Sequence, residues 1–146
     1  MASRDEASAE PPLVLMDLDA STPPLAAIRR RIADALADLS THERHAVLLV
    51  ATELVTNAYE HAWFACQIRL WRIRRPDVVL VEVDDISPYP PVLGLSQLDE
   101  TRGNGLRLVD NFTTRWGTTA QAAGKTVWAQ IGLHSPIDAA APTGCR

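Results

Sequence analysis

The sequence predicts an α+β protein, a two-layer sandwich in which helices cover one face of a mixed, mainly antiparallel sheet. The first observation is a helical spacing of apolar residues between positions 23 and 62. The second is a change to a period of two, over residues 66–85 and again over 113–133. The predicted order is strand, two helices, two strands, loop, helix and two strands, and such an order favours a two-layer arrangement.

The first half of the chain contains one short strand and two helices. LVLMDLD, residues 13–19, is typical of a strand, and STPP ends it with turn and cap signals. We predict a helix over 23–39, with one buried stripe formed by Leu25, Ile28, Ile32, Leu36 and Leu39. Ser40 or Thr41 can cap the next helix. Its core side is predicted to comprise Val47, Leu48, Ala51, Leu54, Val55, Ala58 and Ala62.

The second half is predicted to contain two hairpins separated by a long loop. CQIRLWRIRR and VVLVEVDD flank a turn at Arg75-Pro76-Asp77. Residues 86–104 are rich in Pro, Gly and polar residues, which indicates a loop, and long loops in small domains are usually functional. GLRLVDNF, from Gly105, is typical of a short amphipathic helix, and the strands predicted over 113–120 and 125–133 close the sheet.

Length and composition indicate one folded domain. A chain of 146 residues with 47% hydrophobic and 22% charged residues can bury a core. Residues 1–11 and 135–146 are small, polar or Pro-bearing, so we predict tails there and a domain over residues 12–134.

Charge and hydropathy exclude several classes of function. The formal net charge of −4 argues against direct nucleic-acid binding, and the basic runs at 29–31 and 72–75 are interpreted as solvated faces. No apolar run approaches the roughly 18 to 20 residues of a membrane span, and the acidic start lacks a secretory signal. The two cysteines, Cys66 and Cys145, are predicted to be free thiols in a reducing compartment. We therefore predict a cytoplasmic protein.

The stretch ATELVTNAYEHA, residues 51–62, carries a polar stripe on a helix that also needs a core side. Glu53, Asn57 and His61 are spaced by four, so their side chains share nearly one angular position. A solvated helix face is one interpretation. The other is a binding site, because a carboxamide oxygen is a neutral Mg²⁺ ligand and a nearby carboxylate can accept a proton.

Three further motifs are each ambiguous when taken alone. Asp84 and Asp85 end a Val-rich strand, where a carboxylate can accept from an exocyclic amine or simply initiate a turn. Gly103 and Gly105 precede a helix, where they can admit an anion or act as a hinge. GKTVW, residues 124–128, is not a phosphate-binding loop, because the upstream glycine is missing and a strand follows.

Together and in this order, the four motifs resemble the GHKL ATPases, the superfamily shared by gyrase, histidine kinases and a heat-shock chaperone. The likeness covers residues 25–131. Within the superfamily, the chain most resembles the anti-sigma-factor serine kinases and the related stand-alone ATP-binding regulators of actinobacteria. Their motif reads roughly E-L-V-T-N-A-x-x-H-A, and this chain has Glu53 to Ala58 followed by His61-Ala62. The resemblance implies a Bergerat-type ATP-binding fold with ATP and Mg²⁺ as cofactors.

The resemblance also implies roles for individual residues. Glu53 would be the general base, Asn57 the Mg²⁺ ligand and His61 a matching member of the same motif. Asp85 would read the adenine amino group, with help from Thr126. The remaining residues expected near the phosphates are Arg102, Gly103, Gly105 and Leu106.

The chain departs from the superfamily in two places. The motif D-x-G-x-G is here Asp85-Ile86-Ser87-Pro88-Tyr89, so both glycines are replaced. No dimerisation helix with a phosphoacceptor histidine precedes the domain, so a complete sensor histidine kinase is not expected.

The function implied by the resemblance is that of a serine/threonine protein kinase. Its substrate would be a small STAS-like anti-sigma antagonist domain, and phosphorylation would free the kinase to hold a sigma factor. A homodimer is a candidate assembly. One alternative is a non-catalytic module that binds nucleotide and protein. Another is a catalytic domain acting on a separate histidine-bearing protein.

Overall fold

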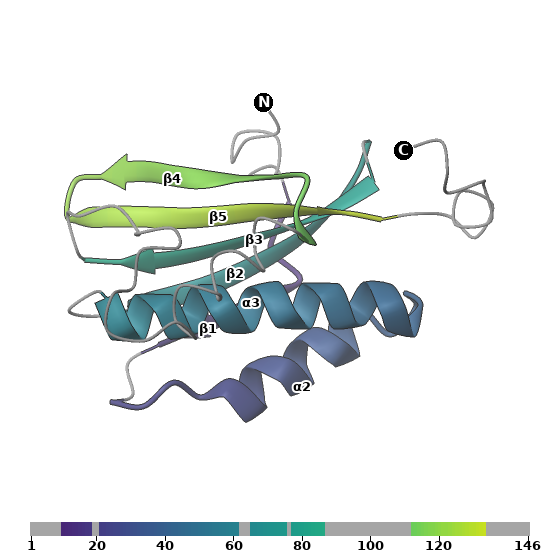
Figure 1. Cartoon of the computed structure of the whole chain (residues 1–146), viewed down its shortest axis with the longest axis horizontal. Coiled ribbons are helices and arrows are strands. Elements are labelled where there is room, and N and C mark those ends of the chain that lie inside the picture. Colours follow the sequence, from purple (N-terminus) through teal and green to yellow (C-terminus); the bar gives the residue numbers. More distant parts are fainter. Residues whose placement is uncertain (1–9, 19–20, 62–64, 76, 87–111, 134–146) are drawn as a thin grey trace.

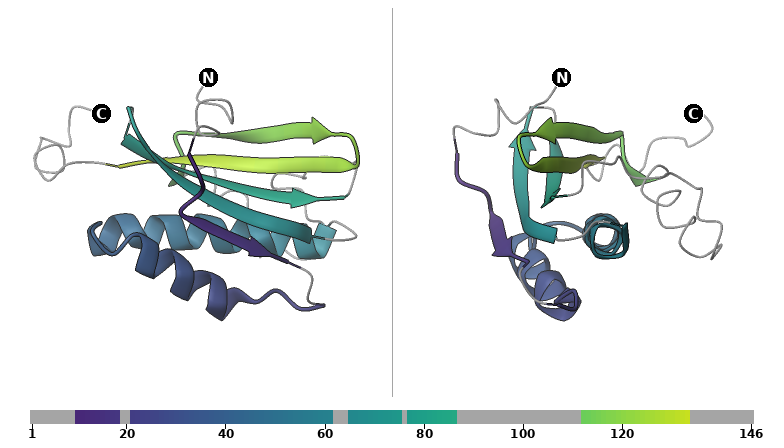
Figure 2. Two further views of the ribbon diagram at one scale, coloured as in Figure 1. Left: turned by 180° about the vertical axis from the view of Figure 1, so that it is seen from behind. Right: turned by 90° about the vertical axis from the view of Figure 1, so that its left-hand side faces the viewer.

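The chain folds into one antiparallel sheet with two helices on one of its faces (Figure 1, Figure 2). The computed structural model describes residues 10–18, 21–61, 65–75, 77–86 and 112–133. Within these residues the elements are β1 (Val14–Asp17), α2 (Leu25–Ala35), α3 (Thr41–His61), β2 (Ala65–Arg74), β3 (Asp77–Asp85), β4 (Arg115–Gln121) and β5 (Gly124–Gly132). This arrangement confirms the predicted two-layer α+β class.

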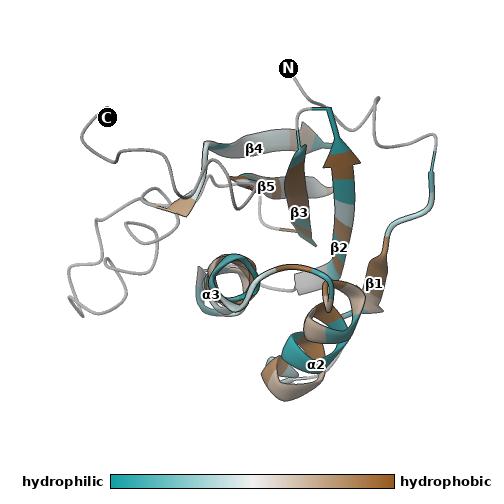
Figure 3. Cartoon of the chain, turned by 90° about the vertical axis from the view of Figure 1, so that its right-hand side faces the viewer, coloured by the Kyte–Doolittle hydropathy of each residue, from teal (hydrophilic) through white to brown (hydrophobic). Residues whose placement is uncertain are grey.

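The described strands lie in the order β1-β2-β3-β5-β4, and every neighbouring pair is antiparallel. Both predicted hairpins, β2–β3 and β4–β5, are present. β3 is central and the most uniformly buried strand, since both of its neighbours and the helix layer remove it from water (Figure 3).

The core lies between the sheet and the helices. Because side chains alternate along a strand, every second residue of the central strands faces the helices. The buried cluster combines those strand residues with one stripe from each helix, and includes Ile28, Ile32, Val47, Leu54, Val55, Ile68, Leu70, Val79, Val81, Val83, Val127, Ala129 and Ile131. The opposite face of the sheet carries a smaller buried pair, Trp71 and Leu80, with Ile73 and Trp128 packed beside it.

Helix α2 is shorter than the sequence predicts. The prediction was residues 23–39, but the helix spans Leu25–Ala35 and the chain turns at residues 36–38. Pro23 and Pro24 lack N–H donors and precede the first turn, while Asp38 beyond the helix forms an ion pair with Arg72 of β2 at 2.9 Å. Leu36 and Leu39 are still buried, so the apolar spacing marked the core correctly but not the helix end.

Helix α3 begins at a capping box. The Glu43 backbone N–H donates to Ser40 Oγ at 3.1 Å, and the Ser40 backbone N–H donates to Glu43 Oε1 at 3.3 Å. Ser40, rather than Thr41, is therefore the capping residue. This reciprocal arrangement satisfies two backbone donors and fixes where the helix starts.

Several predicted segments lie outside the described residues. These are the loop at 86–104 apart from Ile86, the helix at 105–112 apart from Phe112, and the tails apart from residues 10 and 11. Neither of the two described helices has the combination of length and apolar composition that crossing a bilayer requires.

The cap gives a direct test of how α3 is held. Ser40→Ala should lower the free energy of unfolding by about 1 kcal/mol, because an N-terminal donor of α3 loses its partner. Chemical denaturation followed by circular dichroism measures this value. Thr41→Ala is the matched control and should change stability less, and equal losses in the two variants would contradict the assignment of Ser40.

Candidate nucleotide site

The polar stripe predicted on α3 lies beside the core residues of the same helix. Glu53 and Asn57 are half-buried, whereas the intervening Leu54, Val55 and Ala58 are buried. His61 is the last residue of α3, and its side chain lies outside the described residues. The helix thus presents a carboxylate and a carboxamide one turn apart at the border of its buried side.

Glu53 lies in an environment that disfavours its charged form. Burial raises the pKa of the Glu53 carboxyl, and the negative charge of Glu60, two turns along α3, raises it further. A glutamate with a raised pKa is a stronger base than an exposed one and is suited to accepting a proton.

Asp85 lies at the same end of the molecule as the last turns of α3. Three residues separate His61 from Ala65, and Ala65 is the register partner of Asp85, so α3 ends close to the end of β3 (Figure 1). Val79, Val81 and Val83 face the helices, and the period of two puts Asp85 on that same face. The structure therefore places Asp85 at the end of the two layers where α3, the helix that carries the stripe, ends.

Asp85 is paired with a residue that the sequence analysis missed. Lys125 of β5 is its register partner, and Lys125 Nζ lies 3.0 Å from Asp85 Oδ1. Asp85 is 4% exposed and Lys125 is 7% exposed. A buried ion pair thus lies at the end of the central strand pair β3–β5, at the position expected to read a base.

The Thr126 hydroxyl contacts Asp84 in the structure, and the role predicted for Thr126 beside Asp85 stays a prediction. Consecutive strand residues point to opposite faces, so Lys125 faces the helices and Thr126 faces away. The Thr126 hydroxyl instead donates to Asp84 Oδ1 at 2.6 Å. A signal for Lys125 was already present in the sequence. Lys125 is spaced by two from Val127, Ala129 and Ile131, so the strand period places all four on the same face.

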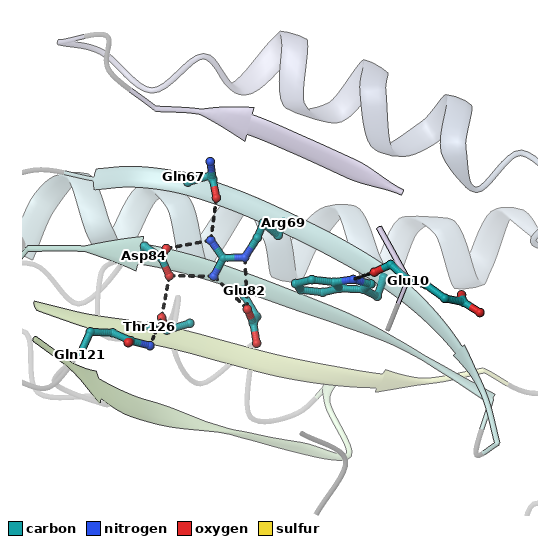
Figure 4. Close-up of polar contacts among 8 residues, drawn as sticks. Glu10, Gln67, Arg69, Glu82, Asp84, Gln121 and Thr126 are labelled. Atoms are coloured by element: carbon teal, nitrogen blue, oxygen red, sulfur yellow. Dashed lines mark hydrogen bonds and ion pairs between the residues drawn. The ribbon is translucent and has the colours of Figure 1, made fainter. Parts of the chain in front are cut away.

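On the face away from the helices, a second group of charges holds Asp84 (Figure 4). The Arg69 guanidinium donates to both oxygens of Asp84, at 2.7 and 2.8 Å, and to Glu82 at 2.9 Å. Gln67 Oε1 accepts from Arg69 at 2.8 Å. The hydrogen bond to Asp84 raises the pKa of Arg69 above its usual range, against the opposing effect of burial. These bonds fix the backbone of β3 next to Asp85.

Gly124 allows β5 to approach the end of β3. Its φ is 154°, and an added Cβ would overlap the carbonyl oxygen of Asp85 and lie 2.6 Å from Ile86 Cα. No other residue fits there without moving the backbone that carries Asp85.

The other residues predicted for the site, Arg102, Gly103, Gly105 and Leu106, lie outside the described residues. Within the described ranges no cluster of three His, Cys, Asp or Glu side chains could hold a metal by itself.

The order of elements, the stripe on α3 and the aspartate ending β3 define a GHKL-type ATP-binding fold. The chain belongs to the histidine kinase-like ATPase domain family, whose model matches residues 18–131. ATP is the nucleotide that membership of this family implies, and the described residues fit it. Asn57 offers a neutral oxygen ligand, and Asp85 offers an acceptor at a buried position.

Solved structures share the fold at low sequence identity. The structure of the RsbU and RsbW domains of Rv1364c from Mycobacterium tuberculosis matches 87% of this chain with a TM-score of 0.65 and 18% identity. The blue-light activated histidine kinase EL346 of Erythrobacter litoralis matches 76% with a TM-score of 0.52 and 20% identity. The chain covers 34% and 42% of those two chains. No curated protein matches it significantly.

The close approach at Gly124 can be tested by substitution. Gly124→Ala should lower the free energy of unfolding by more than about 1 kcal/mol, because the new methyl group displaces the backbone at Asp85. Denaturant unfolding measures the loss. Gly132→Ala on the same strand is the control, since its Cβ would meet only the Thr114 Cγ2 methyl, at 3.0 Å. Similar stability of the two variants would contradict the steric account.

Proposed function

We propose that the chain is an ATP-dependent serine/threonine protein kinase domain that phosphorylates an anti-sigma antagonist and controls a sigma factor by partner exchange. The observation that carries the proposal is the placement of Asp85 where α3 ends, because the same helix carries Asn57 and Glu53, whose raised pKa suits a base. Family membership supports the ATP-dependent part of this function.

The proposed roles follow from the chemistry of each side chain. Asn57 would hold Mg²⁺ through its amide oxygen, and Asp85 would accept a hydrogen bond from the adenine amine. Glu53 would take the proton from a serine or threonine hydroxyl of the partner. Bound Mg²⁺ would supply charge neutralisation at the phosphates, and phosphoryl transfer needs little more than that and correct positioning. Arg102 and the turn at 103–106 are proposed to contact the phosphates.

The partner is proposed from the resemblance and from the solved structures. The Rv1364c structure contains an RsbW domain together with an RsbU domain, and this chain shares its fold. We propose a STAS-like antagonist domain as the substrate and a sigma factor as the alternative partner. A homodimer and a cytoplasmic location remain part of this proposal.

A second candidate function is a nucleotide-dependent binding module that does not transfer phosphate. The altered turn after Asp85 motivates it, because Ser87 and Tyr89 replace both glycines of the superfamily motif. Labelled ATP, Mg²⁺ and candidate antagonist domains distinguish the candidates. An acid-stable phosphoester on a partner serine or threonine supports the kinase. An acid-labile label on a histidine supports a histidine-directed enzyme, and binding without label supports the module.

The role of Glu53 is tested by Glu53→Gln. We expect phosphoryl transfer to fall by about a hundredfold or more, because the general base is lost. The variant should be at least as stable as the wild type at neutral pH, since the raised pKa means that folding disfavours the Glu53 charge. Single-turnover transfer and thermal unfolding measure the two effects. Asp34→Asn, an exposed change on α2 with the same loss of charge, is the control. Unchanged transfer in Glu53→Gln would remove Glu53 from the mechanism.

The pH dependence of transfer gives an independent test. Transfer should increase with pH as Glu53 loses its proton, with a midpoint above that of an ordinary glutamate. Glu60→Gln should move the midpoint to lower pH, because it removes the charge that opposes ionisation of Glu53. The single-turnover rate, measured across the acidic range at saturating Mg²⁺ and ATP, reports the midpoint. A profile that Glu60→Gln leaves unchanged would argue against Glu53 as the titrating group.

A further inference from the structure

Lys125 is the one lysine of the chain, which otherwise carries thirteen arginines as its cationic side chains. It is buried, and its ammonium contacts the buried carboxylate of Asp85. Burying two charges is unfavourable unless their geometry is good, and an apolar pair at such a position is often as stable. A structural role alone therefore gives little reason for this pair.

The position of the pair points to the proposed nucleotide site. Along the helix-facing side, β3 presents Val79, Val81 and Val83 before Asp85, and β5 presents Lys125 before Val127, Ala129 and Ile131. The charged pair thus comes where the apolar core ends, at the end of the layers that also carries the last turns of α3. Gly124 permits the close approach of the two strand ends.

The chemistry of the pair matches the edge of one base. A carboxylate can accept hydrogen bonds at two oxygens and an ammonium has three donors, so each group has the chemistry to bind a base edge as well as its partner. Adenine offers an amino donor at N6 beside a ring acceptor at N1, and proteins read unpaired bases by hydrogen bonds to this edge. Guanine offers the reverse polarity at both positions, with an acceptor at O6 and a donor at N1.

We propose that Lys125 is a second specificity-determining residue of the nucleotide site and donates to adenine N1 while Asp85 accepts from N6. This inference rests on the proposed function, because it needs ATP to bind at the end of β3. It assigns Lys125 the assisting role that the resemblance had implied for Thr126. The compact ammonium suits this role better than a guanidinium would, since an arginine would form a bidentate pair with Asp85.

The test compares ATP with 1-deaza-ATP, which has a C–H group in place of N1. Wild-type protein should bind 1-deaza-ATP about ten- to a hundredfold more weakly, the range expected for a lost hydrogen bond to a charged group. Lys125→Met should bind the two nucleotides with nearly equal affinity, because the donor is absent. Arg115→Met is the matched control: it removes one positive charge from an exposed site at the other end of the β4–β5 hairpin and should keep the wild-type ratio. Isothermal titration calorimetry measures each dissociation constant.

A second measurement uses the single lysine of the wild-type chain. Saturating ATP should slow amine-directed labelling of Lys125 at least about tenfold, in proportion to the occupied fraction, with the labelled peptide identified by mass spectrometry. Equal affinity of the wild type for ATP and 1-deaza-ATP, or labelling that ATP does not slow, would overturn the role of Lys125 and leave the proposed function standing. Failure of the wild type to bind ATP would overturn both. If Lys125→Met does not fold, the ratio of the wild-type dissociation constants for ATP and 1-deaza-ATP and the labelling of Lys125 still test the proposed role.

Discussion

The antiparallel register between β3 and β5 is the constraint on which the site depends. It places Asp84 and Asp85, which are neighbours in sequence, on opposite faces of the sheet, and each meets its own cation there. Arg69 holds Asp84 on the face away from the helices, and Lys125 holds Asp85 on the helix-facing side. The end of β3 is therefore fixed from both sides, and one carboxylate is directed to where α3 ends.

Helix α3 serves the core and the site through two adjacent faces. Its buried residues pack on the strands, and this packing sets the rotation of the helix about its axis. With the rotation fixed, the residues spaced by four must lie along the border of the buried side. The capping box at Ser40 fixes the start of the helix. Glu53 and Asn57 are thereby positioned by structure that has no chemical role itself.

The surroundings of the two carboxylates, Glu53 and Asp85, differ in their electrostatics. Glu53 is disfavoured as an anion, by burial and by Glu60, whereas Asp85 is partnered by a cation. Two carboxylates in one small domain thus lie in different surroundings, one that disfavours its charge and one that is paired with a cation, as the proposed roles of a proton acceptor and a hydrogen-bond acceptor require. This division fits a family of ATPase domains in which positioning supplies most of the catalysis.

The sequence by itself determined the fold class, both hairpins, the start of α3 and the stripe on it, because the two hydrophobic periods and the cap residues are local signals. It also placed a carboxylate at the end of β3. It did not determine where α2 ends, because the apolar spacing continues through Leu36 and Leu39, which are buried beyond the end of the helix. Only the tertiary structure decided that Lys125, and not Thr126, meets Asp85. Strand register depends on pairing between segments some 40 residues apart, and a shift of one residue would exchange the two faces.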